Sequence, residues 1–147
     1  MTFRLLDFLA IEYDQLGVVR ERSGNRNQYS APSDVYLTSD KKYVSLAGST
    51  NATFKGNAAA VGRPDLLDDP RFATNNLRVE NAAELDKIFG NFIATHTLDE
   101  VVEAFDKAKG TVAPIYSVEQ IFNDPQYQAR NAIVSVPDED FGSIALR

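Results

Sequence analysis

Apolar residues recur three and four positions apart along several stretches of this sequence, and each stretch predicts an amphipathic helix. The first covers residues 2–22, where leucines and aromatic residues share one face and Gly24 is expected to end the helix. This helix has almost no lead-in and a wide apolar face, so we expect the chain to begin inside a longer protein. The last predicted strand is cut short, so we expect a truncated end as well.

Capping residues mark the helices that follow. The last three caps each have Glu or Gln three positions further on, which is the capping-box pattern. The predicted caps are Thr50 or Asn51 for a helix through 58–60, Asn81 for one through 85–93, Thr97 for one through 98–108 that Gly110 ends, and Ser117 for one through 118–122.

β-Branched and aromatic residues predict the strands. Residues 35–38 and 43–47 are separated by a short polar loop, which predicts an antiparallel hairpin. Residues 112–116 also look extended, with Pro114 restricting that strand to a sheet edge or a strand end. Two further strands are expected at 133–136 and 144–146, around an acidic turn.

This order of elements predicts an α+β fold, with helices packed on a small, mostly antiparallel sheet and preceded by a long connecting helix. We divide the chain into the connecting helix, residues 1–24, and one small domain, residues 25–147. Both are expected to be cut at their outer ends. With 147 residues and an apolar content of 44%, the chain has enough material for one core.

Composition and charge exclude several classes of function. No apolar run approaches the ~20 residues that span a bilayer, and no leader pattern is present, so we expect a cytoplasmic protein with no membrane partner. The net charge of −6 opposes binding to a phosphate backbone, so nucleic acid is not an expected partner. The absence of cysteine and the single histidine argue against thiolate chemistry and against a metal site.

No complete catalytic set can be assembled from the residues, so we predict no catalytic residue in this chain. His96 lies in a turn without a second histidine and is expected to be solvent-exposed at a helix end. The acids at 68–69 and 138–140 lie in turns where carboxylates are usually solvated, and Asp69 is expected to cap the turn that Arg71 enters. Neither a G-x-S-x-G elbow nor a glycine-rich phosphate loop occurs.

The central stretch, residues 62–81, is the most specific part of the sequence. Its prolines and acids predict an ordered connection rather than a helix interior or a strand. It reads G-R-P-D-L at 62–66, D-P-R-F at 69–72 and R-x-x-N at 78–81. This combination resembles the class III CoA-transferases, the carnitine and bile-acid CoA-transferase family.

Other stretches resemble the same family in the same order. R-S-G-N at 22–25 is similar to the R-x-G-N that ends the family's connecting helix, and residues 97–101, 110–115 and 124–126 resemble a later helix, strand and D-P-Q segment. The chain departs from the family at 40–43, where D-K-K-Y replaces D-G-W in a surface turn that should tolerate change. It departs again at 26–30, where R-N-Q-Y-S replaces the glycine loop of some formyl-CoA transferases.

The resemblance implies transfer of CoA from an acyl-CoA donor to a carboxylate acceptor, through an aspartate nucleophile. That aspartate and most contacts to the CoA nucleotide belong to the portion that would precede Met1, so the chain would be inactive alone. No cofactor is implied, since the CoA thioester is the substrate. The chain resembles the small domain with part of the linking helix, which in the family covers the acyl end of the substrate and helps to join the two subunits of a homodimer.

The loop after the connecting helix is the candidate substrate-binding segment. Its polar side chains could hydrogen-bond an acyl-CoA carboxylate or carbonyl, and a plain interdomain loop is the alternative. The candidate residues are Asn25, Arg26, Gln28 and Tyr29.

Two other functions remain open at this point. Relatives that resemble α-methylacyl-CoA racemases move an α-proton instead of CoA, and their acid–base residues would also lie upstream. The third possibility is a stand-alone, non-catalytic interaction domain that has kept the fold.

Overall fold

The computed structural model describes residues 7–146, and a three-stranded antiparallel sheet lies at its centre. The strands are β1 (Ser33–Leu37), β2 (Tyr43–Ala47) and β3 (Val112–Pro114), in the order β1-β2-β3. Tyr36 of β1 is opposite Val44 of β2, which in turn is opposite Pro114 at the end of β3. The predicted hairpin and the edge position of the proline strand are both confirmed.

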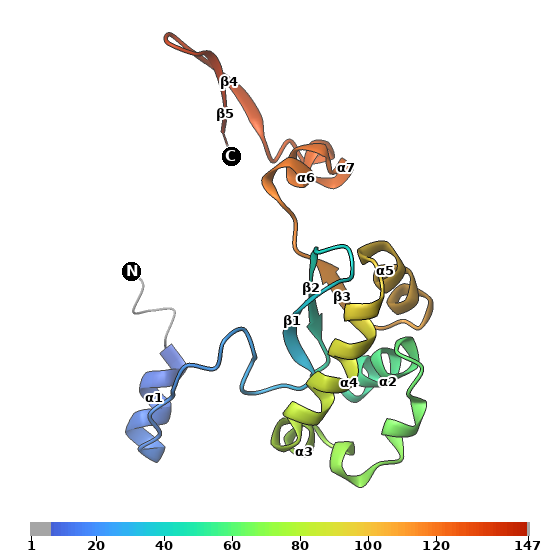
Figure 1. Cartoon of the computed structure of the whole chain (residues 1–147). Helices are drawn as coiled ribbons and strands as arrows, with labels where there is room; N and C mark the ends of the chain where they lie inside the picture. Colours follow the sequence, from blue (N-terminus) through green and yellow to red (C-terminus); the bar gives the residue numbers. More distant parts are fainter. Residues whose placement is uncertain (1–6, 147) are drawn as a thin grey trace.

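Helices pack against this sheet and connect its strands (Figure 1). The predicted α+β fold is therefore confirmed. The helical elements between β2 and β3 are α2 (Asn51–Ala60), η2 (Pro64–Leu67), η3 (Pro70–Phe72), α3 (Asn75–Glu80), α4 (Ala82–Thr95) and α5 (Leu98–Lys107). The connection between α2 and α4, where we predicted no helix, thus contains two 3₁₀ turns and a short α-helix.

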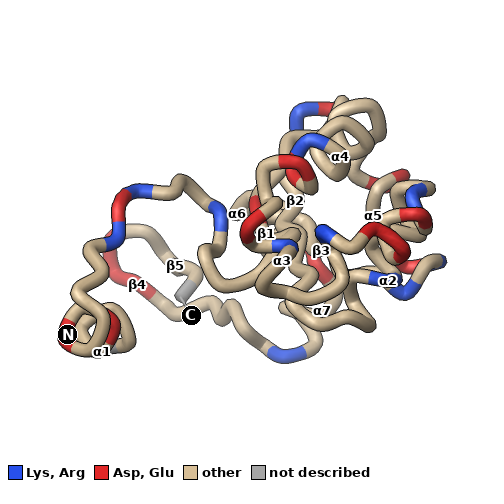
Figure 2. The backbone as a smooth tube through the Cα atoms, turned by 90° about the horizontal axis from the view of Figure 1, so that it is seen from below, with Lys and Arg blue, Asp and Glu red and all other residues tan. Residues whose placement is uncertain are grey.

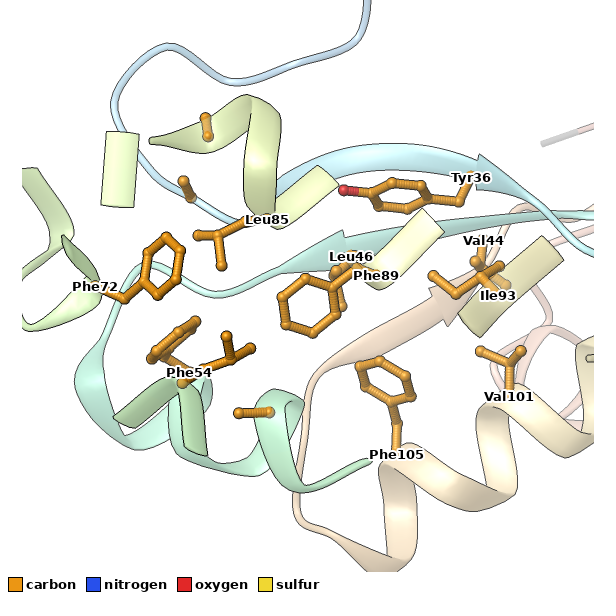
Figure 3. Close-up of a cluster of buried hydrophobic side chains, with 14 of the residues drawn as sticks. Tyr36, Val44, Leu46, Phe54, Phe72, Leu85, Phe89, Ile93, Val101 and Phe105 are labelled. Carbon is orange, nitrogen blue, oxygen red and sulfur yellow. The ribbon is translucent and has the colours of Figure 1, made fainter. Parts of the chain in front are cut away.

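The hydrophobic core lies between the sheet and these helices (Figure 3). Val44 and Leu46 alternate with exposed residues along β2, so one face of the strand supplies the core. The predicted apolar faces of α4 and α5 are buried at helical spacing. The helical residues buried in this way are Leu85, Phe89, Ile93, Leu98, Val101 and Phe105.

Arg78 of α3 is buried inside this core, with 1% of its surface exposed. Its guanidinium donates to the carbonyl oxygens of Ala31, Ser49 and Phe72, at 3.0, 3.1 and 3.1 Å, and to Asn51 Oδ1 at 3.0 Å. It also lies 4.6 Å from the centre of the Phe54 ring. One planar group thus joins the start of β1, the start of α2 and the central connection.

Asn57 of α2 is the second buried polar residue that joins separate segments. Its amide donates to the carbonyl of Ala47 at 2.9 Å and accepts from the backbone N–H of Thr111 at 2.7 Å. A Cβ at Gly110 would lie 2.8 Å from Asn57 Oδ1, so only glycine fits beside it. Gly110 therefore serves this close approach, whereas α5 itself ends earlier, at Lys107.

An arm extends from each end of the core (Figure 1). The first contains α1 (Asp7–Leu16), and the second contains α6 (Val118–Asn123), α7 (Pro125–Ala129) and a hairpin of β4 (Val134–Asp138) with β5 (Gly142–Leu146). Large apolar side chains remain exposed on both, such as Leu16 at 72% and Phe141 at 78%. No helix within residues 7–146 combines the length and hydropathy that crossing a membrane requires.

The first helix is shorter than predicted. It ends at Leu16 instead of Arg22, while its predicted start at 2–6 lies outside the described residues. Gly17 adopts a positive φ of 66° and donates its N–H to the carbonyl of Tyr13, which ends the helix there. Gly24 also has a positive φ but lies in a later turn, so the expectation that it ends the helix was wrong.

The predicted cap at Asn81 was also wrong, although the helix after it is correct. Asn81 already ends α3, and its side-chain amide donates back to the carbonyl of Leu77 at 2.9 Å, so it makes no cap for α4. The Thr97 and Ser117 capping boxes, by contrast, are both confirmed. Asp124 caps α7 (residues 125–129) by accepting from the backbone N–H groups of Gln126 and Tyr127.

Asp40 connects the β1–β2 loop to α5, so this turn is not the freely variable surface turn that we expected. One carboxylate oxygen accepts from Thr38 Oγ1 at 2.6 Å and from the backbone N–H of Leu98 at 3.0 Å. The hydrogen bond from Thr38, followed by that from Leu98 and the nearby Lys42, lowers the pKa of Asp40 to about 2.

Replacing Arg78 should strongly destabilise the core. We expect Arg78→Lys to lower the free energy of unfolding by about 3 kcal/mol or more, because an ammonium cannot reach four separated acceptors and leaves buried carbonyls unpaired. Urea denaturation measures this loss. Arg71→Lys, on an exposed ion pair, is the matched control and should change stability far less; equal effects of the two variants would contradict the role of Arg78.

Asp40→Asn should remove a pH-dependent part of the stability. Because folding lowers the pKa of Asp40 from 3.8 to about 2, the ionised group stabilises the protein above about pH 4, and this contribution disappears as the pH falls toward 2. Thermal unfolding should give a lower Tm for Asp40→Asn at pH 7, with the difference from wild type closing between pH 4 and 2. A difference that persists at pH 2 would refute the charge-dependent contact.

Candidate functional site

The loop with the four candidate residues lies between α1 and β1. Asn25 is exposed in a turn after Gly24, whereas the side chains of Arg26, Gln28 and Tyr29 take part in contacts. These three residues line an open cleft of about 710 Å³, together with Phe8 of α1. The structure thus brings three of the four predicted residues together, and Asn25 does not line the cleft.

Backbone contacts fix this loop to the core. The N–H of Asn27 donates to the carbonyl of Ser33 at 3.0 Å, and the Asn27 side chain accepts from the N–H of Tyr29 at 2.8 Å. Asn75 of α3 donates to the carbonyl of Tyr29 at 2.7 Å and accepts from the N–H of Ala31 at 3.4 Å. The loop therefore has one defined path from the cleft to β1.

An ion pair joins Arg26 to Asp86 of α4, sixty residues away. The other carboxylate oxygen of Asp86 accepts from the Tyr36 hydroxyl at 2.9 Å. Burial of Tyr36, followed by the negative charge of Asp86, raises the pKa of that hydroxyl far above its ordinary value, so the phenol stays protonated and donates. Asp86 is thereby compensated from two sides.

Arg20 holds α1 against the same loop. It pairs with Glu12 of α1, donates to the side chain of Gln28, and its guanidinium lies 4.0 Å from the centre of the Tyr29 ring. The ring of Phe8 meets that of Tyr29 edge-on, with centres 5.3 Å apart. The hydrogen bond from Arg20 lowers the pKa of Glu12, so this carboxylate is ionised and paired at neutral pH.

Basic positions follow one another along the segment from α1 to the core (Figure 2). Arg20 and Arg26 both donate to carboxylates within the chain, as described above. The segment therefore has donors for an oxygen-rich ligand, but binding one would compete with these internal partners.

The other polar candidates have structural roles. Asp69 caps η3 through the N–H of Arg71 at 2.9 Å, as predicted, and Asp138 accepts from the N–H groups of the β4–β5 turn. His96 is not the exposed residue that we expected: it is half-buried, stacks on Phe92 and contacts the carbonyl of that residue at 2.7 Å. Among residues 7–146, no group of three potential metal ligands lies close enough together to hold an ion.

Sequence reasoning missed three residues that shape this site. Asp86 and Asn75 lie on helices, where a polar residue among apolar neighbours is ordinary, and Tyr36 was noted only as a strand residue. Their partners are 44 to 60 positions away in the chain. No local pattern signals contacts over such separations.

Comparison with known proteins supports that resemblance. The family model described as CoA-transferase family III matches residues 1–146. A succinyl-CoA--D-citramalate CoA-transferase from Chloroflexus aurantiacus is 34% identical over 97% of this chain, and an acetyl-CoA:oxalate CoA-transferase from Acetobacter aceti is 34% identical over 90%. The chain spans 36% and 34% of the lengths of these two relatives.

A solved structure agrees with the fold. A CAIB/BAIF family protein from Brucella suis superposes with a TM-score of 0.73 at 26% identity, covering 96% of this chain and 40% of that one. The superposition thus includes the arms as well as the core.

Asn75→Ala should loosen the candidate loop without unfolding the sheet. Removing its two contacts frees the backbone of Tyr29 and Ala31, so we expect hydrogen exchange at 27–31 to accelerate about tenfold while the β1–β2 amides keep their protection. Asn123→Ala, which removes one side-chain contact on α6, is the matched control. Unchanged exchange in the loop would show that Asn75 does not hold it.

Proposed function

The chain belongs to CoA-transferase family III, and we propose that it forms the small-domain part of an acyl-CoA:carboxylate CoA-transferase. The observation that supports this most directly is the family match over residues 1–146, together with transferases at 34% identity. The names of these relatives favour CoA transfer over the racemase reaction. In this proposal the chain covers the acyl end of the substrate and contributes to a homodimer.

The proposed reaction needs a nucleophile from outside this chain. An aspartate carboxylate attacks the thioester carbonyl and expels the CoA thiolate, giving a mixed anhydride. The thiolate then attacks the aspartyl carbonyl, which releases the donor acid and leaves an aspartyl-CoA thioester. The acceptor carboxylate attacks that thioester and expels the thiolate, giving a second mixed anhydride. The thiolate then attacks the acceptor acyl carbonyl, which forms the acceptor's CoA thioester and regenerates the aspartate. The residues of this chain would bind and orient the acyl portion during these steps.

The exposed apolar arms support a role within a larger assembly. Leu16 and Val19 on the first arm are 72% and 69% exposed, and Val118 and Phe141 on the second are 70% and 78% exposed. Side chains of this kind gain stability when another surface covers them. We propose that the rest of the transferase and its partner subunit provide that cover.

The names of the relatives also suggest the substrate class. One name pairs succinyl-CoA with D-citramalate, and the other pairs acetyl-CoA with oxalate, so a short dicarboxylic acid occurs in both. We propose that the complete protein, like the relative named for succinyl-CoA, takes the CoA thioester of a short dicarboxylic acid as its donor. The loop residues Arg26, Gln28 and Tyr29 are the proposed contacts to this acyl group, with Asn25 at the rim of the loop. A cytoplasmic location stays a prediction.

A transfer assay on the complete protein tests this function. With succinyl-CoA as donor and a short carboxylic acid as acceptor, we expect the acceptor's CoA thioester to accumulate, as measured by liquid chromatography with mass spectrometry. The 147-residue chain alone should give no transfer above the uncatalysed rate. Inversion of an α-methylacyl-CoA without any acceptor acid would instead identify the racemase, and transfer by the isolated chain would place the nucleophile within it.

A further inference from the structure

The guanidinium of Arg26 is only partly used in the structure. Its Nη2 donates to Asp86 Oδ2, whereas its Nε is buried and has no hydrogen-bond partner among the described residues. The Nε and Nη2 edge of an arginine is a fork that matches the two oxygens of one carboxylate. Here Nη2 has an acceptor and Nε has none, which leaves a buried donor unsatisfied.

Asp86 does not accept from both Nε and Nη2, because its second oxygen accepts a hydrogen bond from another residue. Oδ1 accepts from the Tyr36 hydroxyl at 2.9 Å, and Tyr36 is a strand residue that is only 9% exposed. The carboxylate of Asp86 therefore faces the sheet with one oxygen and the loop with the other. Arg26, by contrast, lies on the loop, and its side chain retains 39% exposure, against 15% for Asp86.

We propose that Arg26 exchanges Asp86 for a ligand carboxylate, and that this carboxylate is the free, non-reacting one of a dicarboxylic acyl-CoA. This inference rests on the proposed transferase function and identifies the Arg26 guanidinium as the group that recognises the free carboxylate of the substrate. In the bound state both ligand oxygens fill the Nε and Nη2 fork. Arg26 is then the specificity-determining residue, and Asp86 is a positioning residue that holds it when no substrate is present.

Both states of this exchange keep Arg26 in an ion pair and leave Asp86 with a hydrogen bond. Without substrate, Arg26 is paired with Asp86. With substrate, Arg26 is paired with the ligand, and Asp86 keeps its hydrogen bond from Tyr36. A thioester with an uncharged acyl chain cannot replace Asp86, because it offers no anion to the guanidinium. The exchange therefore selects for a terminal carboxylate.

The test compares two donors that differ in one group. Succinyl-CoA and butyryl-CoA have acyl chains of equal length, ending in a carboxylate and a methyl group. For the complete protein, we expect Arg26→Ala to lower the ratio of kcat/KM for succinyl-CoA over butyryl-CoA by about tenfold to a hundredfold, mainly through KM. Arg26→Lys keeps the charge without the fork and should recover only part of that ratio.

Two further variants should shift the same ratio in opposite directions. Asp86→Asn removes the competing charge and should lower the KM for succinyl-CoA about threefold or more, since more of the protein has Arg26 free. Tyr36→Phe frees Oδ1 of Asp86. The carboxylate can then accept from both Nε and Nη2 of Arg26 and hold that residue more tightly, so the KM for succinyl-CoA should rise. A merely structural ion pair predicts that both variants weaken activity on both donors.

Arg63→Ala is the matched control, because it removes another arginine–aspartate pair, the exposed contact to Asp65, at a distance from the loop. It should leave the donor ratio unchanged, and thermal unfolding should show that every variant is folded. If succinyl-CoA is transferred but the ratio stays constant in Arg26→Ala and Arg26→Lys, the exchange is refuted while the transferase function stands. If the wild-type protein transfers CoA from neither donor, the proposed function fails and this inference fails with it.

Discussion

The core depends on a buried cation, Arg78, that has no anionic partner among residues 7–146. Arg78 occupies the centre of the region where β1, α2 and the central connection begin or end, and it satisfies carbonyl groups from all three. Burying a charge is costly unless hydrogen bonds replace its water, and here three backbone carbonyls and one side-chain oxygen do so. Burial also lowers the pKa of Arg78, but an arginine starts so high that it stays charged. The hydrogen bonds of Arg78 thus fix the conformation of the connection between α2 and α4.

That rigid centre positions the loop from which we infer substrate recognition. Asn75 lies on the same short helix as Arg78 and holds the backbone of Tyr29, while Asp86 on the following helix holds Arg26. The loop is therefore anchored to the core at its backbone and at one side chain. Arg20 in turn joins it to α1, so the first arm and the core meet through the segment that lines the cleft.

Much of the fold could be predicted from the sequence, because helical periodicity, capping boxes and the hairpin are local signals. The Thr97 box and the strands at 33–37 and 43–47 are examples. The errors arose where one residue had two possible roles. Gly17 ended the first helix before Gly24 could, and Asn81 had already been used to end α3. The contacts of Arg78, Asp86 and Asn57 could not be predicted, since each joins residues far apart in the sequence and none is hydrophobic.

We propose that these residues bind and orient an acyl group whose chemistry takes place on an aspartate outside the chain. The most direct measurement is to incubate the complete protein with succinyl-CoA in the absence of an acceptor acid, and to locate the covalent CoA adduct by peptide mass spectrometry. We expect an aspartyl-CoA thioester on a peptide outside residues 1–147. An adduct on an acidic residue of this chain, or CoA transfer without any adduct, would contradict it.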